Sequence, residues 1–275
     1  MKRILFLFFA LVFSLCAGPV YNIGIRHDRE ESLFKEFAKQ FPAVCQVSGF
    51  ASGVLIDNEW VLTAAHVVDF FDMLVPDPSQ RVVSFDGKEY TIKEAVVYPG
   101  HIPITPELLS QQDKGDDFNL HDIALLQLER AVQGVKPIMI YRGMEEIGSE
   151  FVIAGYGAFF NDPENGIAPE LLGTLLQGTK RAGMNRFDRE GTRIWTLEAI
   201  FDPPGEGALD LEAFPFVGDS GGPILIKAEG EWKVAGIVSF MEDDEDYIGR
   251  YGSTFTAARV SKYASWIEET IFGIR

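Results

Sequence analysis

The chain has 275 residues, of which 47% are hydrophobic, and carries a formal net charge of −17 at pH 7. This length and apolar content suffice for one large domain or two small ones, each with a buried core. Because so negative a surface repels phosphate groups and anionic lipid headgroups, the composition argues against nucleic acid as a partner.

Residues 1–17 are predicted to be a signal peptide. Two basic residues, Lys2 and Arg3, precede an apolar run over residues 4–13, and small residues follow near Cys16. The run is too short to span a membrane comfortably, and no later stretch reaches about 18 uninterrupted apolar residues. We therefore expect a secreted or periplasmic protein without membrane contact after cleavage. A lipid anchor on Cys16 is the minor alternative, because the residues before it fit a lipoprotein signal poorly.

Residues 18–43 are predicted to be an N-terminal segment with one short helix. Its apolar residues recur at helical spacing: Leu33, Phe34, Phe37 and Phe41. Asp28 and Glu31 fit the start of a helix, and Pro42 ends the pattern.

From Val44 onward, short apolar runs such as "WVLTAA", "IALLQL" and "KVAGIVSF" alternate with Gly, Pro, Asp and Asn. This texture predicts an all-β body of barrel or sandwich type. Cys45, the one cysteine left after signal cleavage, lies in an apolar stretch and is expected to be a small buried hydrophobe rather than a reactive thiol. The last segment, residues 259–275, has apolar residues on one side and is predicted to be a docked helix.

Ser220 lies in the motif "GDSGGP", residues 218–223, which reads either as a glycine-rich turn or as the setting of a nucleophile. A serine hydroxyl is a weak nucleophile unless a base takes its proton and a third group orients that base. The same letters match the nucleophile elbow of α/β-hydrolases, which have their histidine after the serine. No histidine follows Ser220, so the order along the chain excludes that fold.

Two residues that precede Ser220 in the chain, a histidine and an aspartate, are suited to assist it. His66 ends the strand-like stretch "WVLTAAH", which would present an imidazole at the rim of a barrel. Asp122 begins an apolar strand, where a carboxylate would be partly buried. His27 and His101 have no partner spacing, and His121 would point to the other face of its strand, so these three are expected to be structural or on the surface.

With the order His66, Asp122, Ser220, the sequence resembles the trypsin/chymotrypsin family of serine proteases from about Gly49 to the C-terminal helix. The resemblance implies two six-stranded antiparallel β-barrels with the catalytic cleft between them, followed by the C-terminal helix. The first barrel would span residues 44–140 and carry His66 and Asp122, and the second would span residues 141–258 and carry Ser220. Many members have a cysteine directly after the catalytic histidine; Val67 stands there, which indicates a bacterial, disulfide-free type.

The resemblance also implies a role for each matching residue. Ser220 would attack the scissile carbonyl, His66 would be general base and then acid, and Asp122 would orient the imidazole. The backbone N–H groups of Gly218 and Ser220 would form the oxyanion hole. Ser239 would contact Asp122 and begin the strand on which the substrate backbone pairs.

Activation in the family uses a newly cut N-terminus, whose α-amino group pairs with the aspartate before the serine, here Asp219. Ile25 lies at about the right distance upstream, although the usual activation sequence is missing. Whether this chain is a zymogen stays open.

Specificity in the family depends on the residue six positions before the serine, which is Phe214. An apolar floor there, with Phe240 and Met241 as a wall after Ser239, predicts cleavage after small or apolar residues. If the loop before the serine is shifted by two residues, Glu212 would reach the pocket and favour basic residues instead.

The sequence thus predicts a secreted serine endopeptidase that acts on proteins or peptides through an acyl-enzyme. It is expected to be a monomer, without cofactor or metal. Two alternatives stay open, which are an inactive binding or regulatory protein on the same fold and an esterase with the same triad.

Overall fold

The computed structural model describes residues 23–105, 121–160, 162–166, 178–205, 207–242 and 249–273. The predicted signal peptide lies outside these residues. In the described parts of the chain, no helix has both the length and the apolar character needed to span a membrane.

A short strand and a helix precede the barrels. Strand β1 (Ile23–Ile25) is followed by helix α2 (Glu31–Ala38), whose Phe34 and Ala38 are buried. The helix begins after Glu30 without a side-chain cap, and Asp28, which we expected at the helix start, bonds Arg26 instead. Helix α2 packs on the edge of the second sheet, where its Glu31 accepts a hydrogen bond from the buried Arg181.

The first half is a closed barrel of six strands, as predicted. In chain order the strands are β2 (Val44–Val47), β3 (Ala51–Asp57), β4 (Trp60–Thr63), β5 (Val82–Phe85), β6 (Lys88–Val97) and β7 (Ala124–Leu128), and they close in the order β2-β3-β4-β7-β6-β5. Helices α3 (Ala65–Asp69) and α4 (Phe71–Leu74) and the 3-10 turn η1 (Pro78–Gln80) connect β4 to β5.

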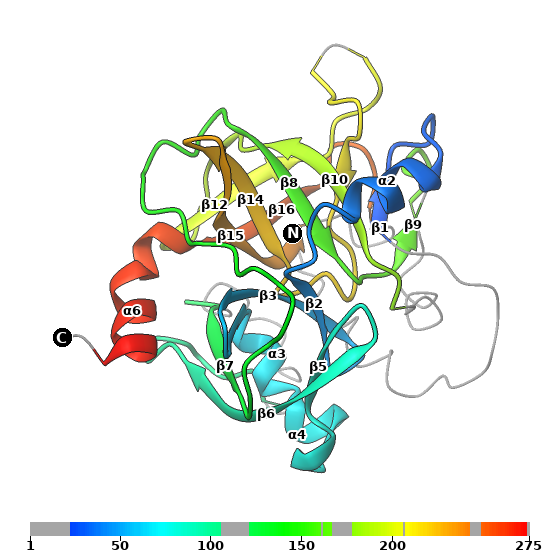
Figure 1. Ribbon diagram of the computed structural model, residues 1–275. Helices are drawn as coiled ribbons and strands as arrows, with labels where there is room; N and C mark the ends of the chain where they lie inside the picture. The colour runs from blue at the N-terminus through cyan, green and yellow to red at the C-terminus, as the bar shows by residue number, and fades with distance from the viewer. Residues whose placement is uncertain are drawn as a thin grey trace.

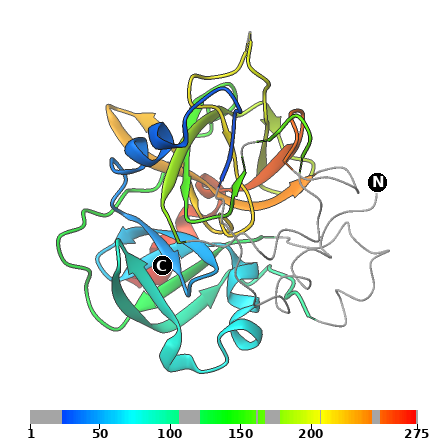
Figure 2. The same ribbon diagram turned by 90° about the vertical axis from the view of Figure 1, so that its right-hand side faces the viewer.

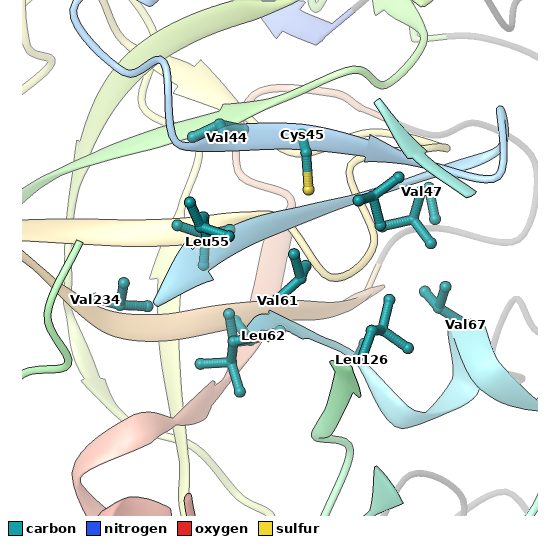
Figure 3. Packing of buried hydrophobic residues seen from close by; sticks show 14 of the residues in the cluster. Val44, Cys45, Val47, Leu55, Val61, Leu62, Val67, Leu126 and Val234 are labelled. Atoms are coloured by element: carbon teal, nitrogen blue, oxygen red, sulfur yellow. The ribbon is translucent and has the colours of Figure 1, made fainter. Parts of the chain in front are cut away.

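The barrel is filled mainly by aliphatic side chains, among them Val44, Val54, Leu62 and Leu126. Cys45 lies among them with no exposed surface, beside side chains of β3 and β4 (Figure 3). Burial raises the pKa of its thiol, so this cysteine is a core residue, as expected. A side chain at Gly53 would come within 2.7 Å of Val61, so the strands pack too closely there for anything larger.

The second half is an open sheet of seven strands and differs here from the predicted closed barrel of six. The strands are β8 (Glu150–Gly155), β10 (Arg181–Arg186), β11 (Arg189–Glu190), β12 (Thr196–Ile200), β14 (Pro223–Ala228), β15 (Glu231–Glu242) and β16 (Thr254–Arg259), in the order β10-β8-β14-β15-β16-β12-β11. No backbone ladder closes it between β10 and β12; the amide of Asn185 donates instead to the carbonyls of Ile200 and Ala213.

A small third sheet lies next to the second half. Strand β1 lies between β13 (Ala213–Phe214), to which it is antiparallel, and β9 (Phe159–Phe160), to which it is parallel. Gly24 is paired with Phe214 in this register. The start of the described chain is thus fixed beside the segment that leads to Ser220.

The predicted C-terminal helix is present but begins later than expected. Strand β16 continues to Arg259, whose guanidinium is held by the buried Glu146, and a 3-10 turn η4 (Val260–Tyr263) precedes helix α6 (Ala264–Phe272). Figure 1 shows α6 beside the first barrel, and Ile267 packs into a core cluster that includes side chains of both halves. Figure 2 shows the cyan and teal strands of the first barrel below the yellow and orange strands of the second sheet.

Candidate active site

His66 and Asp122 meet at one rim of the first barrel. Strands β4 and β7 are antiparallel neighbours with Thr63 paired to Ala124, so the residues just after β4 and just before β7 lie at the same edge. His66 Nδ1 is 2.7 Å from Asp122 Oδ2, and the backbone N–H of His66 donates to Asp122 Oδ1 at 2.9 Å. Both side chains are almost fully buried, and the two bonds fix the imidazole relative to the carboxylate.

A serine from the second half joins this pair. Ser239 lies on β15, and its Oγ donates to Asp122 Oδ2 at 2.5 Å. Asp122 therefore accepts from both halves of the molecule. This contact is the one that the resemblance implied for Ser239.

The electrostatics of the pair favour a charged Asp122 and a basic His66. Burial alone would raise the pKa of the Asp122 carboxyl, but the charge of His66 and the hydrogen bonds of His66 and Ser239 lower it to about 2. For His66, burial lowers the pKa, while the charge and hydrogen bond of Asp122 and the more distant charge of Asp69 raise it, and the net shift is upward. Asp122 is thus ionised throughout the neutral pH range.

Ser220 lies in a turn packed against the segment that carries His66. Its carbonyl accepts from Ser52 N at 2.9 Å, and Ser52 Oγ donates to the Gly218 carbonyl. Gly221 has φ +78°, and a Cβ there would be 2.0 Å from Thr63 Oγ1 and 2.9 Å from Ala64 N. Only glycine fits this approach, and Ala64 is two residues before His66. The turn that contains Ser220 is therefore packed against the residues directly before His66.

The backbone N–H groups of Gly218 and Ser220, both in this turn, are suited to bind an anion. Gly218 has φ +93°, a left-handed conformation that glycine adopts without strain. Within the described residues, the N–H groups of Gly218 and Ser220 are not donated to another protein group, whereas those of Asp219, Gly221 and Gly222 are. A pair of such donors beside a nucleophile is what an oxyanion hole requires.

Asp219, the residue predicted to pair with a new N-terminus, is fully buried. Its carboxylate accepts from the N–H groups of Gly157 and Phe216, each at 2.9 Å. A Cβ at Gly155 or Gly157 would lie within about 2.4 Å of this carboxylate, so the loop can close around it only with glycines. Burial raises the pKa of Asp219 to about 7, against the lowering effect of the two hydrogen bonds and of Arg181. Its negative charge is therefore incompletely compensated.

The predicted specificity residues lie in different surroundings. Phe214 is not exposed at all and stacks on Phe201 at 5.6 Å, whereas Met241 is half-buried. The guanidinium of Arg193 lies over the ring of Phe240, 4.0 Å from its centroid, in a cation–π contact that no local pattern of the sequence indicated.

Glu212 lies directly before strand β13, in which Phe214 is paired with Gly24 of β1. The carboxylate of Glu212 is buried and accepts from Leu209 N at 2.8 Å. Burial raises its pKa to about 8.

The three other histidines have partners that the sequence did not reveal. His27 contacts the Tyr251 hydroxyl, and His121 contacts the Tyr263 hydroxyl. His101 Nε2 is 2.7 Å from Asp69 Oδ2, and this pair is buried.

The buried pair of Asp69 and His101 was missed because its partners are 32 residues apart. Asp69 ends helix α3, one turn after His66, and its Oδ2 also accepts from Ile104 N at 2.9 Å. The segment of His101 to Ile104 is thus fastened to the helix that carries His66. Asp69 lies close enough for its charge to contribute to the raised pKa of His66.

We expect the acidic limb of kcat/KM to have its midpoint above pH 6.5. His66 must be neutral to accept a proton, and its pKa is raised above the ordinary value of 6.5, so activity should already fall as the pH drops through that higher value. Rates with a peptide substrate between pH 5 and 9 test this. A rate that is constant from pH 5 to 8 would contradict the role of His66.

Asp69→Asn is expected to move that acidic limb to lower pH. The substitution removes a negative charge that raises the pKa of His66, while the amide oxygen can still accept from Ile104. Asp72→Asn is the matched control, because Asp72 is 94% exposed on α4 and solvent screens its charge. Equal pH profiles for wild type and Asp69→Asn would show that this carboxylate has no influence on the base.

Comparisons with a family model and with curated relatives agree on one protein family. The sequence model of the Trypsin family matches residues 35–267. Among curated relatives, granzyme M of Rattus norvegicus is 28% identical over 236 residues, which cover 82% of this chain and 80% of the relative. A snake venom serine protease of Crotalus durissus durissus is 29% identical, with 82% and 80% covered, and kallikrein-8 of Mus musculus is 24% identical, with 80% and 76% covered.

Solved structures include a similar fold. A structure described as neuropsin, a serine protease expressed in the limbic system of mouse brain, superposes with a TM-score of 0.58 at 20% identity. The match covers 84% of this chain and 94% of that one.

Proposed function

The chain belongs to the trypsin family of serine endopeptidases, and from this premise we propose that it cleaves peptide bonds with Ser220 as nucleophile, His66 as general base and Asp122 as its orienting acid. One observation carries the proposal, which is the buried chain of bonds from Ser239 through Asp122 to His66 beside the Ser220 turn.

The geometry supports a two-step reaction. His66 accepts the Ser220 proton while Oγ bonds to the scissile carbonyl carbon, and the resulting oxyanion accepts from the N–H groups of Gly218 and Ser220. The protonated His66 then donates to the leaving amine as the C–N bond breaks, which leaves an acyl-enzyme. Water then adds to the acyl carbon while His66 takes one of its protons; the bond between this carbon and Ser220 Oγ breaks, His66 returns the proton to Oγ, and the carboxylic acid product leaves and ionises.

The ionised Asp122 supports the step in which His66 becomes protonated. When His66 takes up a proton, a positive charge appears in a buried place, and the carboxylate at 2.7 Å stabilises it. Ser239 holds that carboxylate in turn.

We further propose activation by a new N-terminus. Antiparallel pairing of β1 with β13 directs the start of β1 toward the residues that follow Phe214, and so toward Asp219. A chain beginning at or near Ile23 would bring an α-amino group closer to Asp219 than one beginning at Ile25, which is paired further back. That positive charge would compensate the buried carboxylate.

We propose secretion from the sequence of residues 1–17. From the surroundings of Phe214 and Met241 we propose cleavage after small or apolar residues. A protein or peptide substrate and a monomeric enzyme complete the proposal. Cell fractionation with and without residues 1–17 would test export.

Hydrolysis of matched amide and ester substrates tests the proposed reaction. The enzyme should release peptides from a denatured protein and cleave a peptide amide, and pretreatment with a fluorophosphonate should abolish both activities. Turnover of esters alone would favour the esterase. If correctly processed protein showed no turnover and no labelling, the alternative of an inactive binding protein would be favoured.

A further inference from the structure

His121, the residue directly before Asp122, has an unusual backbone conformation. Its φ of +57° lies in the left-handed region, which residues with a Cβ avoid, although histidine and asparagine adopt it more often than most. The His121 carbonyl accepts from Ile123 N at 2.8 Å, in a bond that spans Asp122 and closes a three-residue turn. The conformation of His121 therefore helps to determine the direction in which the Asp122 side chain leaves the backbone.

The ring of His121 is held by side chains from both halves of the molecule. Tyr98 follows β6 of the first barrel, and its ring centroid is 4.9 Å from that of His121. Trp195 directly precedes β12 of the second sheet and lies at 4.9 Å, measured between the same centroids. Tyr263 in η4 lies at 5.8 Å, and its hydroxyl is 3.1 Å from His121 Nδ1. A Cβ at Gly100 would be 2.5 Å from His121 Cδ2, so the backbone also limits the movement of this ring.

The ring of His121 carries no charge where the enzyme is expected to act. Burial and the neighbouring His101 lower the pKa of His121 below the ordinary value of 6.5, so its imidazole is neutral at neutral pH. Removing the ring therefore changes the geometry around Asp122 but leaves the charge there unchanged. Since Asp122 raises the pKa of His66, a displaced Asp122 would make His66 a weaker base.

We propose that His121 is a positioning residue of the triad, whose left-handed backbone and enclosed ring hold Asp122 in the orientation that His66 requires. It acts through Asp122 and not on the substrate. Because Trp195 and Tyr263 lie beyond the first barrel, the orientation of Asp122 then depends on how the two halves meet. The inference rests on the proposed function and deepens it, since it adds a residue that supports the orienting acid.

Two substitutions of His121 separate the contribution of its backbone from that of its ring. His121→Ala removes the ring and disfavours a positive φ, so it should lower kcat for a peptide amide by about 10-fold to 100-fold with KM nearly unchanged. His121→Asn also removes the ring but tolerates a positive φ, so it should recover a large part of that loss. Equal losses in the two variants would contradict the proposal.

Two further measurements respond to the position of Asp122 and not to stability alone. Because Asp122 raises the pKa of His66, the acidic limb of kcat/KM should move to lower pH in His121→Ala. The proton that His66 Nδ1 donates to Asp122 gives a low-field signal in proton NMR, which should broaden or move to higher field. Tyr263→Phe keeps its ring but loses the bond to His121 Nδ1. It should show the same changes at smaller size, and it carries the test if His121→Ala does not fold.

Glu229→Ala is the matched control for the backbone. Glu229 has a φ of +55° and is 83% exposed in the turn between β14 and β15. Strand β14 has 6 residues and begins close to Ser220, so this turn lies roughly 20 Å from the start of the strand. The variant introduces the same unfavourable alanine away from Asp122 and should keep the wild-type kcat, acidic limb and proton signal. Circular dichroism and titration of active serine normalise all rates.

Failure of the inference and failure of the proposed function give different results. Folded His121→Ala and Tyr263→Phe enzymes with the wild-type kcat, acidic limb and proton signal would overturn the inference alone. If folded, processed wild-type protein cleaved no peptide, the proposed function would fall. The low-field signal would then still report whether His121 positions Asp122, because its measurement needs no substrate.

Discussion

Replacing Ser220 or His66 with alanine is expected to lower kcat by about 10³-fold to 10⁶-fold while the fold stays intact. Each substitution removes one member of a group that acts as a unit, so the double variant should be scarcely slower than either single one. Steady-state rates with a peptide amide measure the effect, and thermal melting followed by circular dichroism checks the fold.

His27→Ala is the control for these variants. His27 is exposed and contacts Tyr251, far in sequence from the triad, and should keep the wild-type rate. If Ser220→Ala turned over substrate at the wild-type rate, the nucleophile would have to be another residue.

Asp219→Asn is expected to lower kcat by roughly 10²-fold to 10³-fold, the usual cost of losing one oxyanion-hole donor. The Asp219 carboxylate fixes the turn that presents Gly218 N–H, because it accepts from Gly157 and Phe216. An amide can accept one of these bonds but would place its NH₂ group against the other donor. It would also lose the charge that a new α-amino group would pair with.

The pairing of Asp219 with a new α-amino group can also be tested without a substitution, by identifying the first residue of the active protein. N-terminal sequencing of active material should find a first residue at or near Ile23. Full activity in a chain that begins at Pro19 or Val20 would show that no α-amino group needs to reach Asp219.

Much of the site could be predicted because its residues lie in distinctive local sequences. His66 follows an apolar strand, Asp122 precedes one and Ser220 lies in a glycine-rich turn, and the family that these three stretches resemble indicated the reaction. The pairing of β4 with β7 then explains why His66 and Asp122 meet. The strand pattern predicted an all-β body of barrel or sandwich type, and the resemblance implied the closed first barrel.

Other features depend on contacts that no local pattern encodes. Asp69 and His101 pair across 32 residues of sequence, and Phe255 meets Phe214 only because β16 and β13 enclose one core. The helix after β16 starts late because Arg259 continues the strand and bonds Glu146. The second sheet stays open where Asn185 bonds two carbonyls from its side chain.

The most direct test of the central claim is to locate a covalent adduct. Processed protein is treated with a fluorophosphonate, digested and analysed by mass spectrometry, with His66→Ala treated in parallel. We expect one phosphonyl group on Ser220, formed much more slowly in His66→Ala because the base is missing. An adduct on a different serine, or equal labelling rates in the two proteins, would contradict the assignment of Ser220 and His66.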